Sequence, residues 1–321
     1  MKKILKYVLL FALAALLVYF AFRKVEWHAF LDGLAQTRWF WVILFCIISA
    51  FSLLVRTVRW RDMLIPFDPE IKTIKVWDAI NVGNLASIVL PGSGELLRCG
   101  YVASKKLEYD KSIGTMFCER LWDLLALIIM AVISLLTEWD RIGGFFMDKI
   151  ITPLSSNLLF WVVLVSVIVV ITAIIFAIFR FRDRYAVCLK ISESLSRIWA
   201  GLTAFFKSKN KLRIAFSTVL LWTLYVLMCF CIIKAMPALE GLDMIDALFF
   251  SMVGNVASIV PVPGSVGAYH YLVAAAVGLY GYDWDTGILY ATLNHEIHAV
   301  LIIAIGLVAY FHWMRTMSTK S

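Results

Sequence analysis

Charged side chains inside long apolar segments are the first candidates for chemistry in this sequence. Glu119, Arg120 and Asp123 occur within the apolar stretch 112–136. Helical spacing of three or four residues places Asp123 on the same face as both Glu119 and Arg120. An ionisable group inside a membrane costs at least about 2.5 kcal/mol unless it is paired or faces a cavity. We expect these side chains to line a path for a polar head group or to brace the helices as internal ion pairs, and the two roles are compatible.

Glu95 and Arg98 form a second charged pair, directly after the dipeptide Pro91-Gly92. They are three residues apart, so they share one face of a helix. Arg98 could contact a phosphate, and Glu95 could orient Arg98 or an amine. The alternative is a salt bridge near the cytoplasmic surface.

A third polar group, His295, Glu296 and His298, occurs in the last apolar stretch, 286–313. His295 and His298 are three residues apart and could share a face. A metal site would need further ligands, and neither a His-x-x-x-His motif nor a cysteine pair supplies them, so we expect no metal ion here. These side chains are expected to line a polar cavity or to form hydrogen bonds between helices.

These groups surround a repeated stretch. Residues 83–93 read GNLASIVLPGS and residues 254–265 read GNVASIVPVPGS, and nine of the eleven positions in the first copy recur in the second. Proline lacks an N–H and glycine permits unusual dihedral angles, so Pro-Gly ends an apolar helix inside each copy. Two broken helices at corresponding places in two halves of a membrane protein indicate a transport site.

The break also predicts the kind of ligand. We expect Ser93 and Ser265 to cap the helical arm that returns from each break. The free N–H groups and the dipole of such a helix start attract anions, for example a lipid phosphate. The alternative is a hairpin that only packs against its neighbours. The two copies differ chemically, because the second has Tyr269 and His270 where the first has Glu95 and Arg98.

Four polar residues occupy matched positions in the two copies, namely Asn84, Ser87, Asn255 and Ser258. We expect them to line the cavity and to pair with one another, so that either side can close in turn. The alternative is hydrogen bonding that packs helices together.

Composition shows which elements must position these residues. The chain has 321 residues, of which 62% are hydrophobic and 16% are charged, with a mean hydropathy of +0.86. Soluble domains average about 25% charged residues, so this is a polytopic membrane protein. The net charge of +8 comes from loops between apolar segments, as the positive-inside rule expects, and not from a nucleic-acid surface.

The apolar segments predict one all-α membrane domain over residues 1–321. About six full spans are expected, at 4–22, 39–55, 112–136, 157–179, 214–236 and 286–313. Two re-entrant hairpins are expected at 77–104 and 244–280, within a first half 1–136 and a second half 210–321. A basic amphipathic helix at about 185–209 is expected to lie on the cytoplasmic surface.

Loop charges predict the topology. The segments 56–75, 105–111 and 180–213 are rich in Lys and Arg, which places both termini in the cytoplasm. Three full spans separate the two copies, so they face opposite ways as an inverted-topology repeat. If each hairpin arm crossed fully, ten spans would give the same sides for all loops, so charge alone does not decide between the two arrangements.

Four motifs carry a resemblance to a known family. They are Arg56-Thr57-Val58-Arg59-Trp60, the stretch from Pro91 to Arg98, Glu119-Arg120-Leu121-Trp122-Asp123, and Pro263-Gly264-Ser265-Val266-Gly267. Together they resemble the transmembrane, flippase-like domain of the lysylphosphatidylglycerol synthase family over most of the chain. His270 and His295 depart from the pattern, because Glu and Arg are expected at these positions.

This resemblance implies translocation or handling of a lipid in a bacterial inner membrane. The segment after Trp313 is too short for the soluble aminoacyl-transferase domain of the full synthases, so lysyl transfer is not expected. The implied substrate is an anionic or amino-modified phospholipid or glycolipid, or a polyprenyl-phosphate lipid. No Gly-x-x-x-x-Gly-Lys loop is present, so neither a nucleotide nor another cofactor is expected. The oligomeric state stays open.

Two other functions remain open at this point. The first is an intramembrane transferase that uses Glu119, Asp123 or the His295–Glu296 pair as acid or base. The second is a non-catalytic partner that binds a soluble enzyme through the basic helix in residues 180–213.

Overall fold

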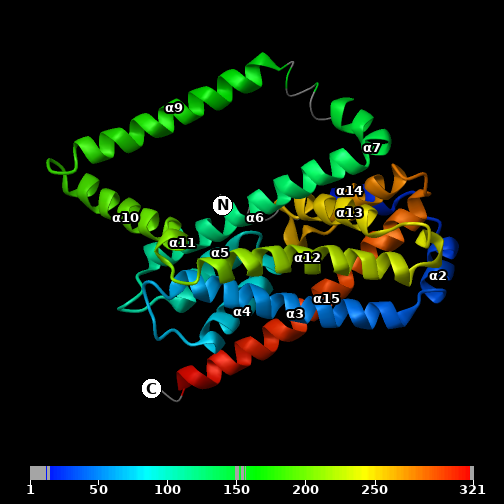
Figure 1. The fold of residues 1–321 in the computed structure, drawn as a ribbon, viewed down its shortest axis with the longest axis horizontal. Coiled ribbons are helices and arrows are strands. Elements are labelled where there is room, and N and C mark those ends of the chain that lie inside the picture. Colours follow the sequence, from blue (N-terminus) through cyan, green and yellow to red (C-terminus); the bar gives the residue numbers. More distant parts are fainter. Residues whose placement is uncertain (1–11, 13–14, 149–151, 153–154, 156, 319–321) are drawn as a thin grey trace.

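Helices make up the regular structure of the described chain (Figure 1). The computed structural model describes residues 12, 15–148, 152, 155 and 157–318. Within them, five helices are long and apolar enough to cross a membrane: α3 (Trp39–Leu64), α6 (Tyr109–Thr137), α9 (Leu158–Arg180), α12 (Lys211–Ala235) and α15 (Trp284–Ser318). Each overlaps a predicted span, which confirms an all-α integral membrane protein. Most of the predicted first span, 4–22, lies outside the described residues.

The two copies of the repeated stretch form two helical hairpins. The first consists of α4 (Thr73–Val89) and α5 (Ser93–Val102), and the second of α13 (Met244–Ala257) and α14 (Ala268–Gly278). At about 1.5 Å per residue, α5 is about 15 Å long, which is half of a hydrocarbon layer of about 30 Å. The returning arm is therefore too short to cross the layer alone. The arms of the first hairpin are in close contact, since a Cβ on Gly83 would lie 2.8 Å from the carbonyl oxygen of Gly94.

Left-handed backbone marks both breaks. Gly92 has φ of 76°, while Gly264 has φ of 59° and Gly267 has φ of 83°, conformations that glycine adopts readily. Gly92 and Gly267 therefore occupy the N-cap positions of α5 and α14. The prediction that serines cap these helices was wrong.

The serine hydroxyls turn back toward the first arm instead. Ser93 Oγ donates to the carbonyl oxygens of Ala86 (3.2 Å) and Leu90 (2.8 Å), and Ser265 Oγ donates to that of Ser258 (3.5 Å). These carbonyls belong to the last turn of the first arm, or directly follow it, where intrahelical donors run out. The N-cap residues are glycines, so they provide no side-chain cap for the first turn of α5 or α14.

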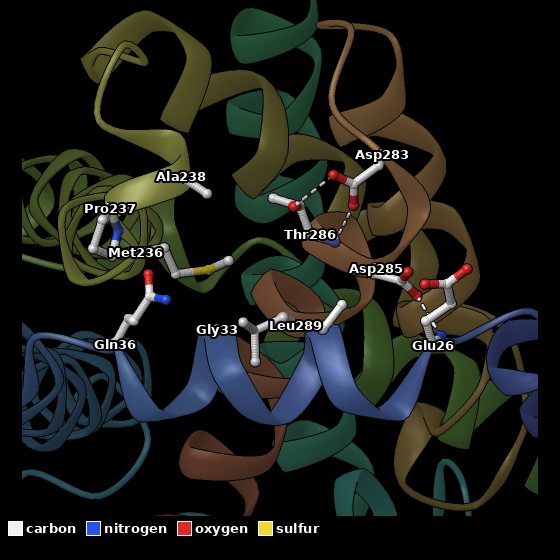
Figure 2. A pocket seen from close by; sticks show the side chains of 11 residues that line it. Glu26, Gly33, Gln36, Met236, Pro237, Ala238, Asp283, Asp285, Thr286 and Leu289 are labelled. Atoms are coloured by element: carbon white, nitrogen blue, oxygen red, sulfur yellow. Dashed lines mark hydrogen bonds between the residues drawn. The ribbon is translucent and has the colours of Figure 1, made fainter.

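The loops at the two ends of the bundle differ in charge. We call one the basic end, where Lys72, Lys75, Lys105 and Lys106, together with Asp68, Glu70 and Asp78, line a pocket of about 950 Å³. We call the other the acidic end, where a pocket of about 380 Å³ is lined by Glu26, Asp283 and Asp285 (Figure 2). Neither Lys nor Arg occurs among the described residues that line this second pocket.

The hairpins begin at opposite ends of the bundle. Lys75 of α4 lies at the basic end, whereas the loop before α13 continues from Met236–Ala238 at the acidic end (Figure 1). Their breaks lie against each other, because a Cβ on Gly264 would lie 3.9 Å from the carbonyl oxygen of Ile88. Their membrane topology itself stays a prediction.

The remaining helices lie around this centre. The predicted amphipathic segment forms α10 (Ala186–Leu202) and α11 (Ala204–Lys207), and α10 packs on α6, where Arg197 pairs with Asp110 at 3.0 Å. α9 extends away from the bundle (Figure 1), and none of the residues in its most hydrophobic window is buried by the rest of the described chain. Two short helices, α2 (Trp27–Ala35) and α7 (Trp139–Phe146), lie in loops, and α7 was not predicted.

Candidate functional site

A cluster of charged side chains lies between α3, α5 and α6 in the first half. We call it the arginine cluster; its members are Arg56, Arg59, Glu95, Arg98, Glu119, Arg120 and Asp123. Glu119 is at its centre and is fully buried. Its carboxylate lies 2.5 Å from Arg98, 2.9 Å from Arg59 and 3.4 Å from Arg56. One carboxylate therefore joins guanidinium groups from two other helices.

Arg98 links the returning arm to this centre. One of its nitrogens, Nη2, lies 2.6 Å from Glu95 and 2.5 Å from Glu119, so the predicted Glu95–Arg98 pair is present. The guanidinium also lies 4.3 Å from the ring centre of Trp60, in cation–π contact. The Arg98 side chain is only 2% exposed, which places the pair inside the bundle.

Asp123 forms the deeper edge of the cluster. It accepts from Arg59 at 2.7 Å and from the indole of Trp222 at 3.4 Å, and it pairs with Arg120 at 3.2 Å. The predicted Arg120–Asp123 contact is therefore present. Asp123 joins α6 to α3 and α12, so the cluster also holds the bundle together.

The arginine cluster has more positive charge and more donors than its own acids use. Four guanidinium groups face three carboxylates, a net charge of 4 − 3 = +1. Arg98 Nη1 and the Nε atoms of Arg59 and Arg120 are buried without a hydrogen-bond partner among the described residues. Buried donors are normally satisfied, so these three are suited to an anion that approaches the cluster.

Arg56 and Arg59 were not among the site residues predicted from sequence. The predicted span ended at Val55, whereas α3 continues to Leu64 and carries both arginines into the bundle. Arg56 donates to Asn84 at 3.3 Å and to Glu95 at 3.2 Å. The spacing of the arginines, three apart before a tryptophan, was the available signal. Of the other predicted residues, Ser87 lies beside Gly94 at the start of α5.

The second half contains a cavity of about 300 Å³ in place of an ion-pair cluster. Its polar lining includes Asn255, Ser258, Tyr269, His295 and His298. The lining also includes Tyr225 of α12 and Asn294 of α15. No Lys or Arg occurs among the described residues that line it, so the two halves of the site differ chemically, as predicted.

The matched asparagines and serines do not pair across the two copies. Asn255 Nδ2 donates to the carbonyl oxygen of Ser251 at 2.8 Å, and Ser258 Oγ donates to that of Gly254 at 2.9 Å. Asn84 is bonded to Arg56 instead. The predicted pairing is therefore absent from this conformation, in which Asn84, Asn255 and Ser258 bond to groups of their own half.

His270 and Glu296 lie beside this cavity. His270, near the start of α14, is 1% exposed, and its Nε2 lies 3.6 Å from Glu296 Oε1. His295 Nδ1 lies 2.9 Å from the same oxygen. The structure thus brings together the residue after the second break and the mid-span pair of α15.

Helix α3 connects the two halves of the site. Ser49 Oγ is 2.8 Å from His298 Nδ1 on the cavity side, and Arg56 belongs to the arginine cluster. Seven residues of helix separate them, a rise of about 10 Å. The two halves of the site are therefore neighbours within the bundle.

Comparison with known proteins identifies the family. The family model described as the lysylphosphatidylglycerol synthase TM region matches residues 6–306. No curated protein and no solved structure matches the chain. The match covers nearly the whole chain and includes the two hairpins and the arginine cluster. The chain is therefore a multi-pass membrane protein of the lysylphosphatidylglycerol synthase transmembrane-region family, with a function that concerns membrane lipids.

Proposed function

We propose that this protein moves lipids with an anionic head group between the two leaflets of a bacterial inner membrane. The observation that carries the proposal is the arginine cluster, with its net positive charge and three unpartnered buried donors. A phosphate matches the planar, multiply donating guanidinium group well. The head group would enter the bundle while the acyl chains stay in the bilayer.

The position of the breaks supports the same function. Irregular backbone at membrane depth is tolerated where it lines a cavity or is buried in protein. The uncapped start of α5 directly precedes Glu95 and Arg98, so backbone N–H groups and a helix dipole add to the attraction of the arginines for an anion. The positive-inside rule puts the basic end in the cytoplasm, so the arginine cluster would receive the head group from that side.

The surroundings of Glu119 do not favour the transferase alternative. A general base must be able to take a proton from its substrate. Glu119 is fully buried among guanidinium groups, with Arg98 and Arg59 within 2.9 Å, which stabilises its charged form. Its geometry is suited to holding arginines in place for a ligand.

Reconstituted vesicles give the test. Lipids with a fluorescent acyl chain would carry phosphatidylglycerol, aminoacylated phosphatidylglycerol or phosphatidylcholine head groups, and a membrane-impermeant quencher would report their movement. Wild-type protein should move phosphatidylglycerol faster than phosphatidylcholine. A charged hydrogen bond contributes about 1.5–3 kcal/mol, so Arg98→Met should slow this movement about 10- to 100-fold.

Two further variants separate transport from folding. Arg98→Lys keeps the charge, and Arg38→Gln removes an exposed arginine that pairs with Glu240 at 3.2 Å outside the cluster. Arg38→Gln should match wild type, and the thermal midpoint of each variant would show whether it folds. If folded Arg98→Met protein moves phosphatidylglycerol at the wild-type rate, or if no lipid moves in a protein-dependent way, the proposal fails.

A further inference from the structure

The second half of the site has three metal-ligating side chains, and neither Lys nor Arg is among the described residues that line its cavity. His270, His295 and Glu296 each offer one ligand atom, and all three atoms lie within 4.8 Å of one another. His270 comes from α14, whereas His295 and Glu296 come from α15. The sequence alone showed only the pair on α15, which is why a metal ion was not expected from it.

We propose that His270, His295 and Glu296 bind one divalent transition-metal ion, with Zn²⁺ as the best match. Zinc takes nitrogen and oxygen ligands at about 2.0–2.2 Å, so two ligands of a tetrahedral ion lie about 3.4 Å apart. The observed separations from Glu296 Oε1, 2.9 Å to His295 and 3.6 Å to His270, are on either side of that value. The largest separation has to close by at most about 1.4 Å, which side-chain rotation can provide.

The ligand types select the ion class. Imidazole nitrogen suits zinc and its transition-metal neighbours, whereas magnesium and calcium prefer all-oxygen sites. His270 faces the site through Nε2, which lies 3.6 Å from Glu296 Oε1, while its Nδ1 is buried without a hydrogen-bond partner among the described residues. The His270 ring packs beside two other rings, with the Phe22 ring centre 5.2 Å away and that of His295 5.4 Å away.

The site would leave one position of the ion open. Three protein ligands and a free fourth position are the arrangement of zinc sites that bind a further molecule. Glu296 is 45% exposed, so this position is accessible. The role of the ion in transport rests on the proposed function. The ion would supply the positive charge in the second half that arginines supply in the first, and it would bind a phosphate oxygen of the head group.

The metal site can be tested without lipid movement. The full chain, without a polyhistidine tag and stripped by a chelator, would be titrated in detergent with Zn²⁺ against a chromophoric chelator, and with Co²⁺ by visible absorption. We expect one ion per chain, absorption typical of a tetrahedral Co²⁺ site, and a higher thermal midpoint with Zn²⁺. His270→Ala and His295→Ala should each weaken Zn²⁺ binding at least tenfold and abolish the cobalt spectrum.

Two histidines provide controls. His28→Ala changes an exposed residue of α2, and His312→Ala changes an exposed residue at the basic end that is bonded to Asp78. Both should bind Zn²⁺ as wild type does. Absence of stoichiometric Zn²⁺ binding, or equal binding by folded His270→Ala protein, would overturn the metal site. A failure of lipid movement with intact Zn²⁺ binding would count against the proposed function and leave the metal site standing.

Discussion

Replacing Glu119 by Gln tests whether this carboxylate holds the arginine cluster together. The substitution keeps the side-chain shape and removes the charge that Arg98, Arg59 and Arg56 share. Four guanidinium groups would then face two carboxylates, so the net charge of the cluster would rise from +1 to 4 − 2 = +2. Repulsion among buried cations would oppose folding.

The magnitude follows from the burial of the pair. Removing one partner of a buried ion pair costs about 3–5 kcal/mol. For a domain of 150–250 residues, 1 kcal/mol shifts the thermal midpoint by roughly 2–4 °C. We therefore expect the midpoint of Glu119→Gln to fall on the order of 10 °C, measured on purified protein in one detergent by loss of intrinsic fluorescence.

A matched control uses another glutamate that pairs with a cation. Glu70 contacts Lys106 at the basic end, where its side chain is 79% exposed. Exposed pairs contribute little, so Glu70→Gln should leave the midpoint unchanged within error. If Glu119→Gln is no less stable than Glu70→Gln, the assignment of Glu119 as the centre of the cluster is wrong.

Three further substitutions address separate parts of the structure. Gly94→Ala should destabilise the protein by about 1–3 kcal/mol in the same thermal assay, because its Cβ would meet the backbone of Gly83. Gly100→Ala is the control and should be near neutral, because the nearest atom to its Cβ would be 3.7 Å away. Asp62→Asn should cost about 1.5–3 kcal/mol, because it weakens the charged hydrogen bonds between buried Asp62 of α3 and half-exposed Arg213 of α12; an unchanged midpoint would contradict this role. Trp60→Leu should slow phosphatidylglycerol movement several-fold in the vesicle assay by removing the cation–π contact that orients Arg98, and equal rates would show that Trp60 only packs.

Sequence patterns predicted the elements well where one strong signal dominated. The positions and hydropathy of the five described spans, and the Pro-Gly breaks of both hairpins, followed directly from composition and from backbone chemistry, although α3 continues nine residues beyond its predicted end. The prediction for the serines failed, because a hydroxyl can bond either to the helix that follows it or to the one before it. Spacing within one segment does not decide between these partners.

The sequence predicted only part of the site, because it reveals contacts within one helix but not contacts between helices. Contacts within one helix, such as Arg98 with Glu95 and Arg120 with Asp123, follow from spacing. Contacts between helices, such as Arg59 with Glu119 or His270 with Glu296, depend on how helices rotate and pack, which one sequence does not reveal. The same limit explains why the matched asparagines and serines were expected to pair with one another.

Helix α9 is exposed to its surroundings along its length, so packing within the protein does not restrict its sequence. None of the residues in its apolar core is buried by the rest of the described chain, and its mean hydropathy in that window is 3.3. Packing therefore imposes no shape on these side chains, and the bilayer requires only that they be apolar and sufficient in number. Homologues should exchange Val, Ile, Leu and Phe freely along α9, while insertions or deletions there should be rare. A scrambled α9 of the same composition should still yield a folded protein.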